Sequence, residues 1–196
     1  MTKAGRTRQH IIERTAPLFN VKGFEGTSVS DLTEATGLTK GALYGNFADK
    51  EEIALEAFRY SIRKVRDLIR KDLAAAKSNK QQLLSLLDFY SHYVKNPPVP
   101  GGCPLLNTAV EVDDHHTSMR KIVAREINAT VDFMASLIQR GIAAGEFKPA
   151  TKARALAYTF FCCIEGAVMF SRVERSEEPM KIVVSHCKKI LNEISQ

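Results

Sequence analysis

The 196-residue sequence has few cysteines, no long apolar run and no apolar segment at its start. Its four cysteines do not form a CxxC pair, so a disulfide framework is not expected and a reducing compartment suits the chain. The most apolar stretch, residues 155–164, stops at Glu165, well short of the roughly 20 residues that span a bilayer. Residues 1–6 lack the apolar core of a signal peptide. We therefore expect a cytoplasmic protein without a membrane partner.

The sequence also lacks the usual motifs of enzymes. It contains no GxGxxG, Walker loop, GxSxG or HExxH, and its five histidines have no evident nucleophile partner. We therefore expect no catalytic residue and no cofactor. Metal-ligand types gather only at Asp113, Asp114, His115 and His116. Adjacent residues lack the i, i+4 spacing of helical metal ligands, so we interpret this run as a loop and helix cap and predict no metal site.

The composition is that of an ordinary folded protein with a basic charge balance. Hydrophobic residues make up 44% and charged residues 26%, which excludes wholesale disorder. The net charge is +6. Residues 1–77 carry 14 Lys and Arg against 10 Asp and Glu, whereas the remaining residues carry 14 against 12. This modest concentration of positive charge near the start weakly favours a polyanionic partner.

Apolar residues recur every three or four positions nearly everywhere, which predicts an all-α fold of about nine helices. Pro17 interrupts the first helix, but the apolar spacing continues past it, so we expect a bend, not an end. Gly23 is typical of a helix end. Residues 96–104 contain four prolines and two glycines and cannot form a regular helix. No strand-like alternation is present.

Two short helices are predicted between residues 28 and 47. Ser28 followed by Asp31 is typical of a capped helix start, and the first helix runs to about residue 36. Gly37 permits a sharp turn, and Thr39 can cap a second helix over residues 40–47. Two such helices joined by a short glycine-containing turn make a helix-turn-helix. We expect residues 1–48 to form a three-helix domain and residues 49–196, beginning with a long helix, a second helical domain.

Residues 26–52, GTSVSDLTEATGLTKGALYGNFADKEE, closely resemble the DNA-binding signature of the tetracycline-repressor (TetR) family. The shared features are the Thr-Ser pair, the Ala-x-Gly turn, the Thr-Lys-Gly-x-Leu-Tyr core, the Phe and the Lys-Glu-Glu start of the long helix. The resemblance covers residues 6–58, under a third of the chain. Asn46 departs from the His of many members, but both side chains can donate to a phosphate. The resemblance implies a DNA-binding domain followed by a helical domain for effector binding and dimerisation.

The chemistry of this segment also suits DNA on its own. A short helix presented by its N-terminus can enter the major groove, where the small Gly41 and Ala42 allow close approach to base edges. Lys40 can donate to guanine or to a phosphate, although a lysine alone is usually only a solvated surface residue. Phe47 is interpreted as a core residue. The predicted DNA-binding residues are Thr27, Ser28, Thr39, Lys40, Gly41, Ala42, Tyr44, Asn46 and Lys50.

The resemblance implies an effector pocket in the remaining helices. Polar or aromatic residues inside otherwise apolar helices are its candidate lining: Tyr90, Tyr93, Cys103, Asn107, Glu111, Phe133, Phe161 and Glu165. A carboxylate such as Glu165 among apolar residues is costly unless paired, either with an effector or with Arg154 or Arg172. The Gly-Cys-x-Leu-x-Asn segment resembles that of a TetR subgroup in which some members sense oxidants or electrophiles. The alternative for Cys103 is a small buried apolar residue.

The last two helices, residues 151–173 and 177–195, are rich in apolar residues. Paired with their copies they would make a four-helix interface of a two-fold dimer. The candidate contacts are Ala153, Leu156, Ala157, Phe160, Val183, Val184, Cys187, Ile190 and Leu191, which could alternatively only close the core of one chain. The expected function is a repressor that binds double-stranded operator DNA as a homodimer and is released by a small-molecule effector. The alternative is a helical ligand-binding protein that binds no DNA.

Overall fold

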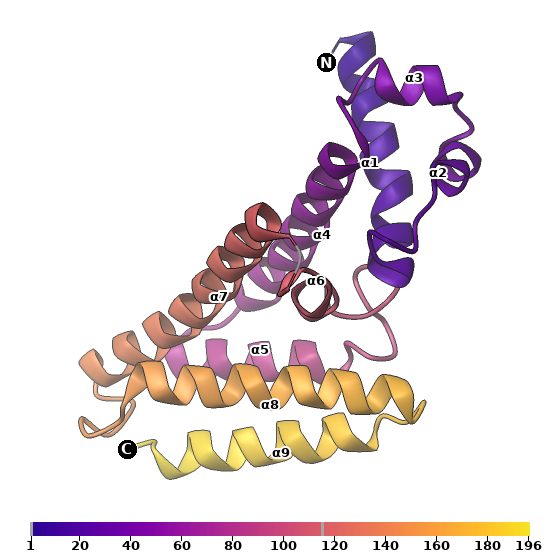
Figure 1. Ribbon diagram of the computed structural model, residues 1–196. Coiled ribbons are helices and arrows are strands. Elements are labelled where there is room, and N and C mark those ends of the chain that lie inside the picture. Colours follow the sequence, from indigo (N-terminus) through magenta and orange to yellow (C-terminus); the bar gives the residue numbers. More distant parts are fainter. Residues whose placement is uncertain (1, 115) are drawn as a thin grey trace. The chain divides into compact units, whose positions relative to one another are not determined.

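The computed structural model describes residues 2–114 and 116–196, and Figure 1 shows its course. These residues form nine helices, which confirms the predicted all-α fold; their one β feature is an isolated antiparallel bridge between Phe147 and Ser195. The helices are α1 (Lys3–Lys22), α2 (Val29–Thr36), α3 (Lys40–Tyr44), α4 (Lys50–Leu73), α5 (Asn79–Ser91), α6 (Pro104–Val112), α7 (Thr117–Ala143), α8 (Ala153–Val173) and α9 (Glu178–Glu193).

α3 ends earlier than the apolar spacing predicts. α3 ends at Tyr44, three residues short, because the amides of Asn46 and Phe47 both turn back to the carbonyl of Leu43. α5 ends at Ser91, and tighter turns carry the chain to residue 96. In contrast, α1 continues through Pro17 as expected. Apolar periodicity locates a helix well but continues into the turns that follow it, since these turns also bury side chains.

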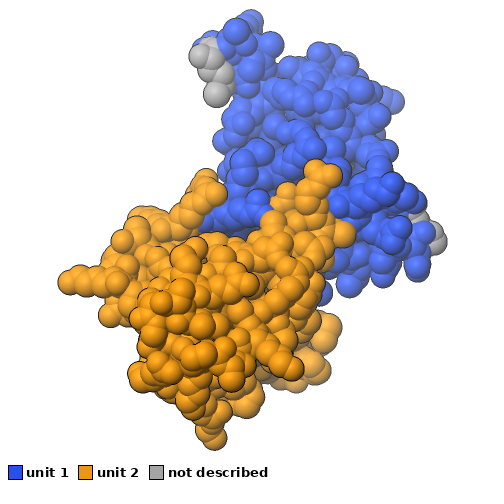
Figure 2. Space-filling model, turned by 90° about the vertical axis from the view of Figure 1, so that its left-hand side faces the viewer, with its two compact units in different colours: residues 1–66, 98–123 blue, residues 67–97, 124–196 orange. Residues whose placement is uncertain are grey.

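The chain folds into two compact units (Figure 2). The first comprises residues 1–66 and 98–123, and the second residues 67–97 and 124–196. This division does not coincide with the domain boundary predicted between residues 48 and 49. The first turns of α4 belong with α1–α3 because Ile53 is fully buried in their core. α6 joins the same unit although it follows in sequence only after α5.

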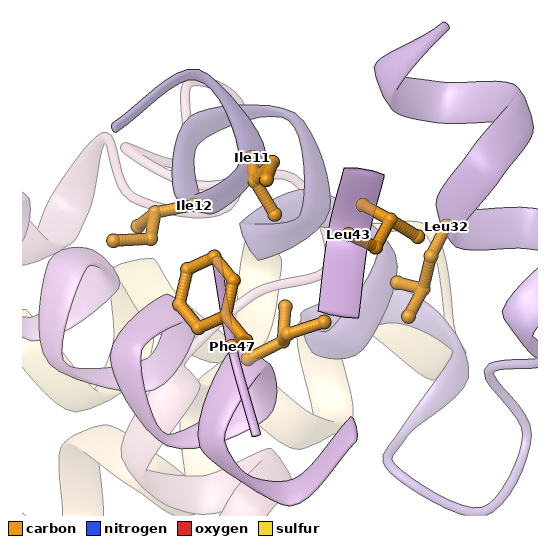
Figure 3. Close-up of a cluster of buried hydrophobic side chains, with 6 residues drawn as sticks. Ile11, Ile12, Leu32, Leu43 and Phe47 are labelled. Atoms are coloured by element: carbon orange, nitrogen blue, oxygen red, sulfur yellow. The ribbon is translucent and has the colours of Figure 1, made fainter. Parts of the chain in front are cut away.

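One hydrophobic cluster of the first unit gathers one or two side chains from each of α1, α2, α3 and α4 (Figure 3). Ile11 and Ile12 of α1 meet Leu32 of α2 and Leu43 of α3, and all four are at most 5% exposed. Phe47 packs beside the α1 isoleucines, as a core residue, in agreement with its sequence interpretation. Burying a side chain of this size contributes about 1.5–3 kcal/mol, so the short helices α2 and α3 depend on this shared cluster for their stability.

The second unit is built around α8 and α9, which pack against each other (Figure 1). α5 also contacts α9. Lys188 of α9 forms an ion pair with Asp88 of α5. The carboxylate of Glu146 caps α5 by accepting hydrogen bonds from the amides of Asn79 and Lys80 at 3.1 and 2.8 Å. Burial pushes the pKa of Glu146 up, but these hydrogen bonds outweigh it and the pKa is lowered.

One face of α8 is exposed. Its buried face includes Phe160, Ile164 and Val168, whereas Phe170 and Val173 are 54% and 80% exposed. Among the described residues, α8 is the one helix whose length and composition would suffice to cross a bilayer. About 44% of its apolar window is buried.

Candidate nucleic-acid interface

The start of α2 is fixed by a capping box. The amide of Asp31 donates to the hydroxyl of Ser28 at 3.1 Å, and the amide of Ser28 donates to the Asp31 carboxylate at 2.8 Å. Lys22 also donates to this carboxylate, at 2.6 Å. The Lys22 hydrogen bond, followed by those from Ser28, lowers the pKa of Asp31 to about 2. The predicted cap at Ser28 is therefore confirmed, and it sets where the first short helix begins.

The end of α2 is held against α1. Gly37 adopts the left-handed conformation, with φ 68°, and its amide donates to the carbonyl of Thr33. The guanidinium of Arg14 donates to the carbonyl of Ala35, and a ring nitrogen of His10 lies 2.9 Å from the carbonyl of Thr36. Basic side chains at a helix C-terminus suit its partial negative charge. α2 therefore has a fixed position on α1, and the chain turns at Gly37 into α3.

α3 exposes its first residues and buries its last apolar one. Thr39 caps the helix, since its hydroxyl accepts a hydrogen bond from the amide of Ala42 at 3.2 Å. Thr39, Lys40 and Gly41 are exposed, whereas Leu43 is fully buried. A Cβ atom added at Gly41 would meet no other atom nearer than 4.0 Å, so internal packing does not require a glycine there. The open space at Gly41 is instead available to a molecule that approaches from outside.

Tyr44 and Ala42 of the same helix are half-buried, and Ser28 is exposed. Three other predicted DNA-binding residues have partners inside the protein. Thr27 is fully buried and donates to the carbonyl of Gly23 at 2.6 Å. The ammonium of Lys50 donates to the carbonyls of Phe24 and Thr27, and the side-chain amide of Asn46 donates to the carbonyl of Ala42. Their contacts with DNA stay a prediction.

Arg8 is a residue of this region that sequence reasoning missed. Its guanidinium lies 4.0 Å from the centre of the Phe47 ring and donates to the carbonyl of Asn46 and to the carboxylate of Glu52. It thereby ties the residues after α3 and the start of α4 to α1. The partners lie 38 and 44 residues away along the chain, so no local pattern marks this role.

The predicted effector-pocket residues divide between the two units. Cys103, Asn107 and Glu111 belong to the first, and the other five belong to the second. The Asn107 amide donates to Asn20 and to the carbonyl of Gly101, and Glu111 accepts from the amides of Phe24 and Glu25. Glu111 also lines a cavity of about 50 Å³ among α1, α4, α6 and the start of α7. The structure therefore gives Asn107 and Glu111 internal partners that the sequence did not suggest.

In the second unit, Tyr90 and Tyr93 are buried and form an aromatic group with Phe89. The remaining candidates of this unit lie on α7 and α8: Phe133 is 39% exposed, and Phe161 and Glu165 are buried. Arg154, one suggested partner of Glu165, forms an ion pair with Asp132.

The Asp-His run after α6 is only partly described, because His115 lies outside the described residues. His116 lies 3.5 Å from the carboxylate of Glu25 and edge-on to the ring of Phe24. Among the residues that the structure describes, no group of three His, Cys, Asp or Glu side chains could hold a metal ion.

A capped short helix that exposes its N-terminal residues, held at a fixed position by a preceding short helix, is the arrangement of proteins that bind the DNA major groove. The fold and this site define a helix-turn-helix protein. Comparisons with known proteins specify the family. The model of the bacterial regulatory proteins of the tetR family matches residues 11–57, and the tetracyclin repressor-like C-terminal domain matches residues 79–187. The chain belongs to the TetR family of transcriptional regulators, which are DNA-binding proteins.

Solved structures of the family share the whole fold. A TetR-family regulator from Cytophaga hutchinsonii is 39% identical, with a TM-score of 0.92 over 100% of this chain and 98% of that one. A TetR regulator from Chloroflexus aurantiacus is 37% identical, with a TM-score of 0.95 over the same shares. The regulator CifR, in complex with 26-bp operator DNA, is 24% identical, with a TM-score of 0.80 over 92% of this chain and 94% of that one. At that identity the likeness to CifR concerns the fold alone.

Proposed function

We propose that this regulator is a repressor that binds a pseudo-palindromic operator as a homodimer and leaves it when a small-molecule effector binds. The observation that carries the proposal is the exposed start of α3, Thr39 to Gly41, on a frame that caps and ion pairs hold rigid. The operator-bound fold of CifR supports the DNA partner. A protein with this task works in the cytoplasm, where the DNA is, and carries out no catalysis.

Each exposed residue of α3 has a specific task in this proposal. The Lys40 ammonium donates to guanine O6 and N7 or to a phosphate, and Gly41 lets the helix backbone approach the base edges. The Thr39 hydroxyl and the free amides of the helix start suit a phosphate. Tyr44 can donate through its hydroxyl. Ser28 can bind the sugar-phosphate backbone from the start of α2.

The homodimer is proposed to form through the exposed faces of the last two helices. The exposed apolar side chains there are Tyr158, Met169, Phe170, Val173 and Ile182. Several contacts suggested by the sequence are instead buried within the chain, because the same helices also build its core: Ala153, Ala157, Phe160, Val184, Cys187 and Leu191. A two-fold dimer would place two α3 helices in successive major grooves, about 34–36 Å apart.

The effector site is proposed to lie in the second unit, around Tyr90, Tyr93, Phe161 and Glu165. All four are buried, and a site made of aromatic side chains and a carboxylate would suit a mostly apolar ligand with one donor or cationic group. A ligand-bound structure in which Glu165 lies far from the effector would contradict this placement. Cys103 is only 6% exposed. The hypothesis that it senses oxidants or electrophiles is tested by comparing the response of Cys103→Ser and the wild type to thiol-reactive compounds.

The central experiment selects bound sequences from random duplexes with the wild-type chain and then titrates the selected duplex. Lys40→Ala should weaken binding by roughly 1–3 kcal/mol. If Lys40 contacts a phosphate, the slope of the logarithm of affinity against the logarithm of salt concentration should also fall by about one. The control is Lys189→Ala on α9, an exposed lysine whose loss changes the net charge equally. Equal affinities for Lys40→Ala and the wild type would contradict α3 as the recognition helix. Ligand binding without any salt-dependent DNA affinity would favour the alternative, a helical ligand-binding protein.

A further inference from the structure

The turn between α1 and α2, residues 23–27, is held from two sides. Its amide groups point to α6, where the Glu111 carboxylate accepts from Phe24 N at 2.8 Å and from Glu25 N at 3.0 Å. Its carbonyl groups point to α4, where the Lys50 ammonium donates hydrogen bonds to Phe24 O at 2.9 Å and to Thr27 O at 3.1 Å. An anion on the donors and a cation on the acceptors both form charge-assisted hydrogen bonds, which are stronger than neutral ones.

The backbone is shaped for the Glu111 contact. Gly23 has φ 75°, a conformation that side chains other than glycine rarely adopt. A Cβ atom at this position would lie 2.6 Å from Oε1 of Glu111, which is far closer than atoms can approach. The glycine therefore does two things, since it turns the chain after α1 and leaves room for the carboxylate. This double requirement ties residue 23 to Glu111 of α6, a helix that lies far along the chain.

A second contact one helical turn earlier supports the first. Asn107 and Glu111 are four residues apart and so lie on the same face of α6. The Asn107 amide donates to the main-chain carbonyl of Asn20 at 2.8 Å and to the carbonyl of Gly101 at 2.8 Å. Asn20 in turn donates to the carbonyls of Pro100 and Gly102. α6 therefore holds both the last turn of α1 and the residues that follow it.

We propose that Glu111 is a positioning residue for DNA binding: it fixes the turn that sets where α2 begins, and hence where Ser28 and the helix-turn-helix face the DNA. The inference rests on the proposed function. The turn leads directly to the Ser28 cap, so a shift of residues 24 and 25 displaces the start of α2. The Lys50 ammonium donates two of its three hydrogens to carbonyls of the same turn. Loss of Glu111 would therefore also weaken the positioning of the Lys50 side chain.

Electrostatics alone predicts the opposite result, which makes the test sharp. A carboxylate in a DNA-binding unit repels phosphates, so its removal should tighten binding if it has no other role. We expect Glu111→Gln to weaken binding of the selected duplex roughly tenfold, because the amide group can accept only one of the two hydrogen bonds. Asp113→Asn is the matched control, since it removes the same charge two residues later from an exposed position. Its affinity should be unchanged or slightly tighter.

Two further variants separate geometry from charge and from backbone strain. Glu111→Asp keeps the charge but is one methylene too short, and it should also weaken binding. It serves as the second variant if Glu111→Gln does not fold. Gly23→Ala should weaken binding in the same way, because its Cβ atom displaces the carboxylate. Gly145→Ala is the control for a positive φ: Gly145 has nearly the same φ, 73°, but open space around it, so its substitution produces no clash.

Hydrogen exchange of the full-length chain provides a readout that a general loss of stability would not produce. Exchange at the amides of Phe24 and Glu25 should accelerate in Glu111→Gln while the thermal midpoint and the exchange of Leu43 stay as in the wild type. Wild-type binding together with a Glu111→Gln affinity as high as that of Asp113→Asn overturns the positioning role and leaves the proposed function intact. A wild-type chain that binds no duplex overturns the proposed function and this inference with it.

Discussion

At the scale of single residues, the helix-turn-helix depends on polar side chains that satisfy the backbone at helix ends. The side chains of Ser28 and Asp31 each accept a hydrogen bond from the amide of the other residue. Thr39 caps α3, and Lys22 forms an ion pair with Asp31. Free amides at a helix start and free carbonyls at its end cost free energy unless they find such partners. Helices as short as these are marginal by themselves, so each cap matters more here than in a long helix.

The lowered pKa of Asp31 predicts a pH dependence of stability. A carboxyl group whose pKa of about 2 in the folded chain lies below its ordinary value of 3.8 stabilises the fold above pH 4. This contribution is lost as the pH falls from about 4 to about 2. Urea unfolding should therefore show the wild type more stable than Asp31→Asn at neutral pH, with a difference that shrinks in that window. Lys22→Met should raise the pH at which the difference disappears. Parallel profiles for wild type and Asp31→Asn would contradict the assigned shift.

At the scale of elements, the turn between α2 and α3 depends on one left-handed residue. Gly37 has φ 68° and ψ 17°, and its amide closes the last turn of α2. A Cβ atom there would meet nothing within 4 Å, so space does not require the glycine. The requirement lies in the backbone conformation, which side chains other than glycine and asparagine adopt only at a cost. The angle between the two short helices is set at this residue.

Gly37→Ala should therefore lower the free energy of unfolding by about 1–2 kcal/mol through the left-handed conformation alone. Gly37→Asn should cost less, because asparagine tolerates this conformation. Urea titration followed by circular dichroism measures both. Gly145→Ala, at a similar φ and in open space, should cost as much as Gly37→Ala. A much larger loss at residue 37 would show that packing, not conformation, demands the glycine.

At the scale of the whole molecule, the last two helices have an apolar face that a single chain leaves exposed to solvent. Phe170, Val173 and Ile182 are each more than half exposed. Large apolar side chains that are exposed together mark interaction sites in soluble proteins. Two-fold symmetry would bury the patch against its own copy and would also match the chain to a palindromic operator.

Phe170→Asp should convert the proposed dimer into monomers, because a carboxylate buried in an apolar interface is strongly unfavourable. Sedimentation velocity at micromolar concentration should give a mass near twice the chain mass of 21.8 kDa for the wild type and near 21.8 kDa for the variant. Val21→Asp is the control, since Val21 is an exposed apolar residue of α1 outside the patch. A wild type that sediments as a monomer would exclude this mode of DNA binding.

Much of the recognition element is predictable from sequence because its determinants are local. The Ser28 cap, the Gly37 turn and the Thr39 cap follow from spacings of three residues, and the buried Phe47 follows from apolar periodicity. The end of α3 was predicted three residues late, since the turn after Tyr44 also buries an apolar side chain. The candidate pocket was less predictable, because a polar residue inside an apolar helix can face a ligand or another part of the chain.

The helices, their caps and the class of the DNA-binding segment follow from the order of residues alone, because they depend on residues three or four positions apart. The partners of Arg8, Lys50 and Glu111 become clear only in the folded chain, since they lie 23 to 87 residues away. Which face of α8 stays exposed is likewise evident only in the folded chain. Residues with the same local pattern can contact different neighbours, and the packing between helices determines which. The periodicity along the chain does not indicate these contacts.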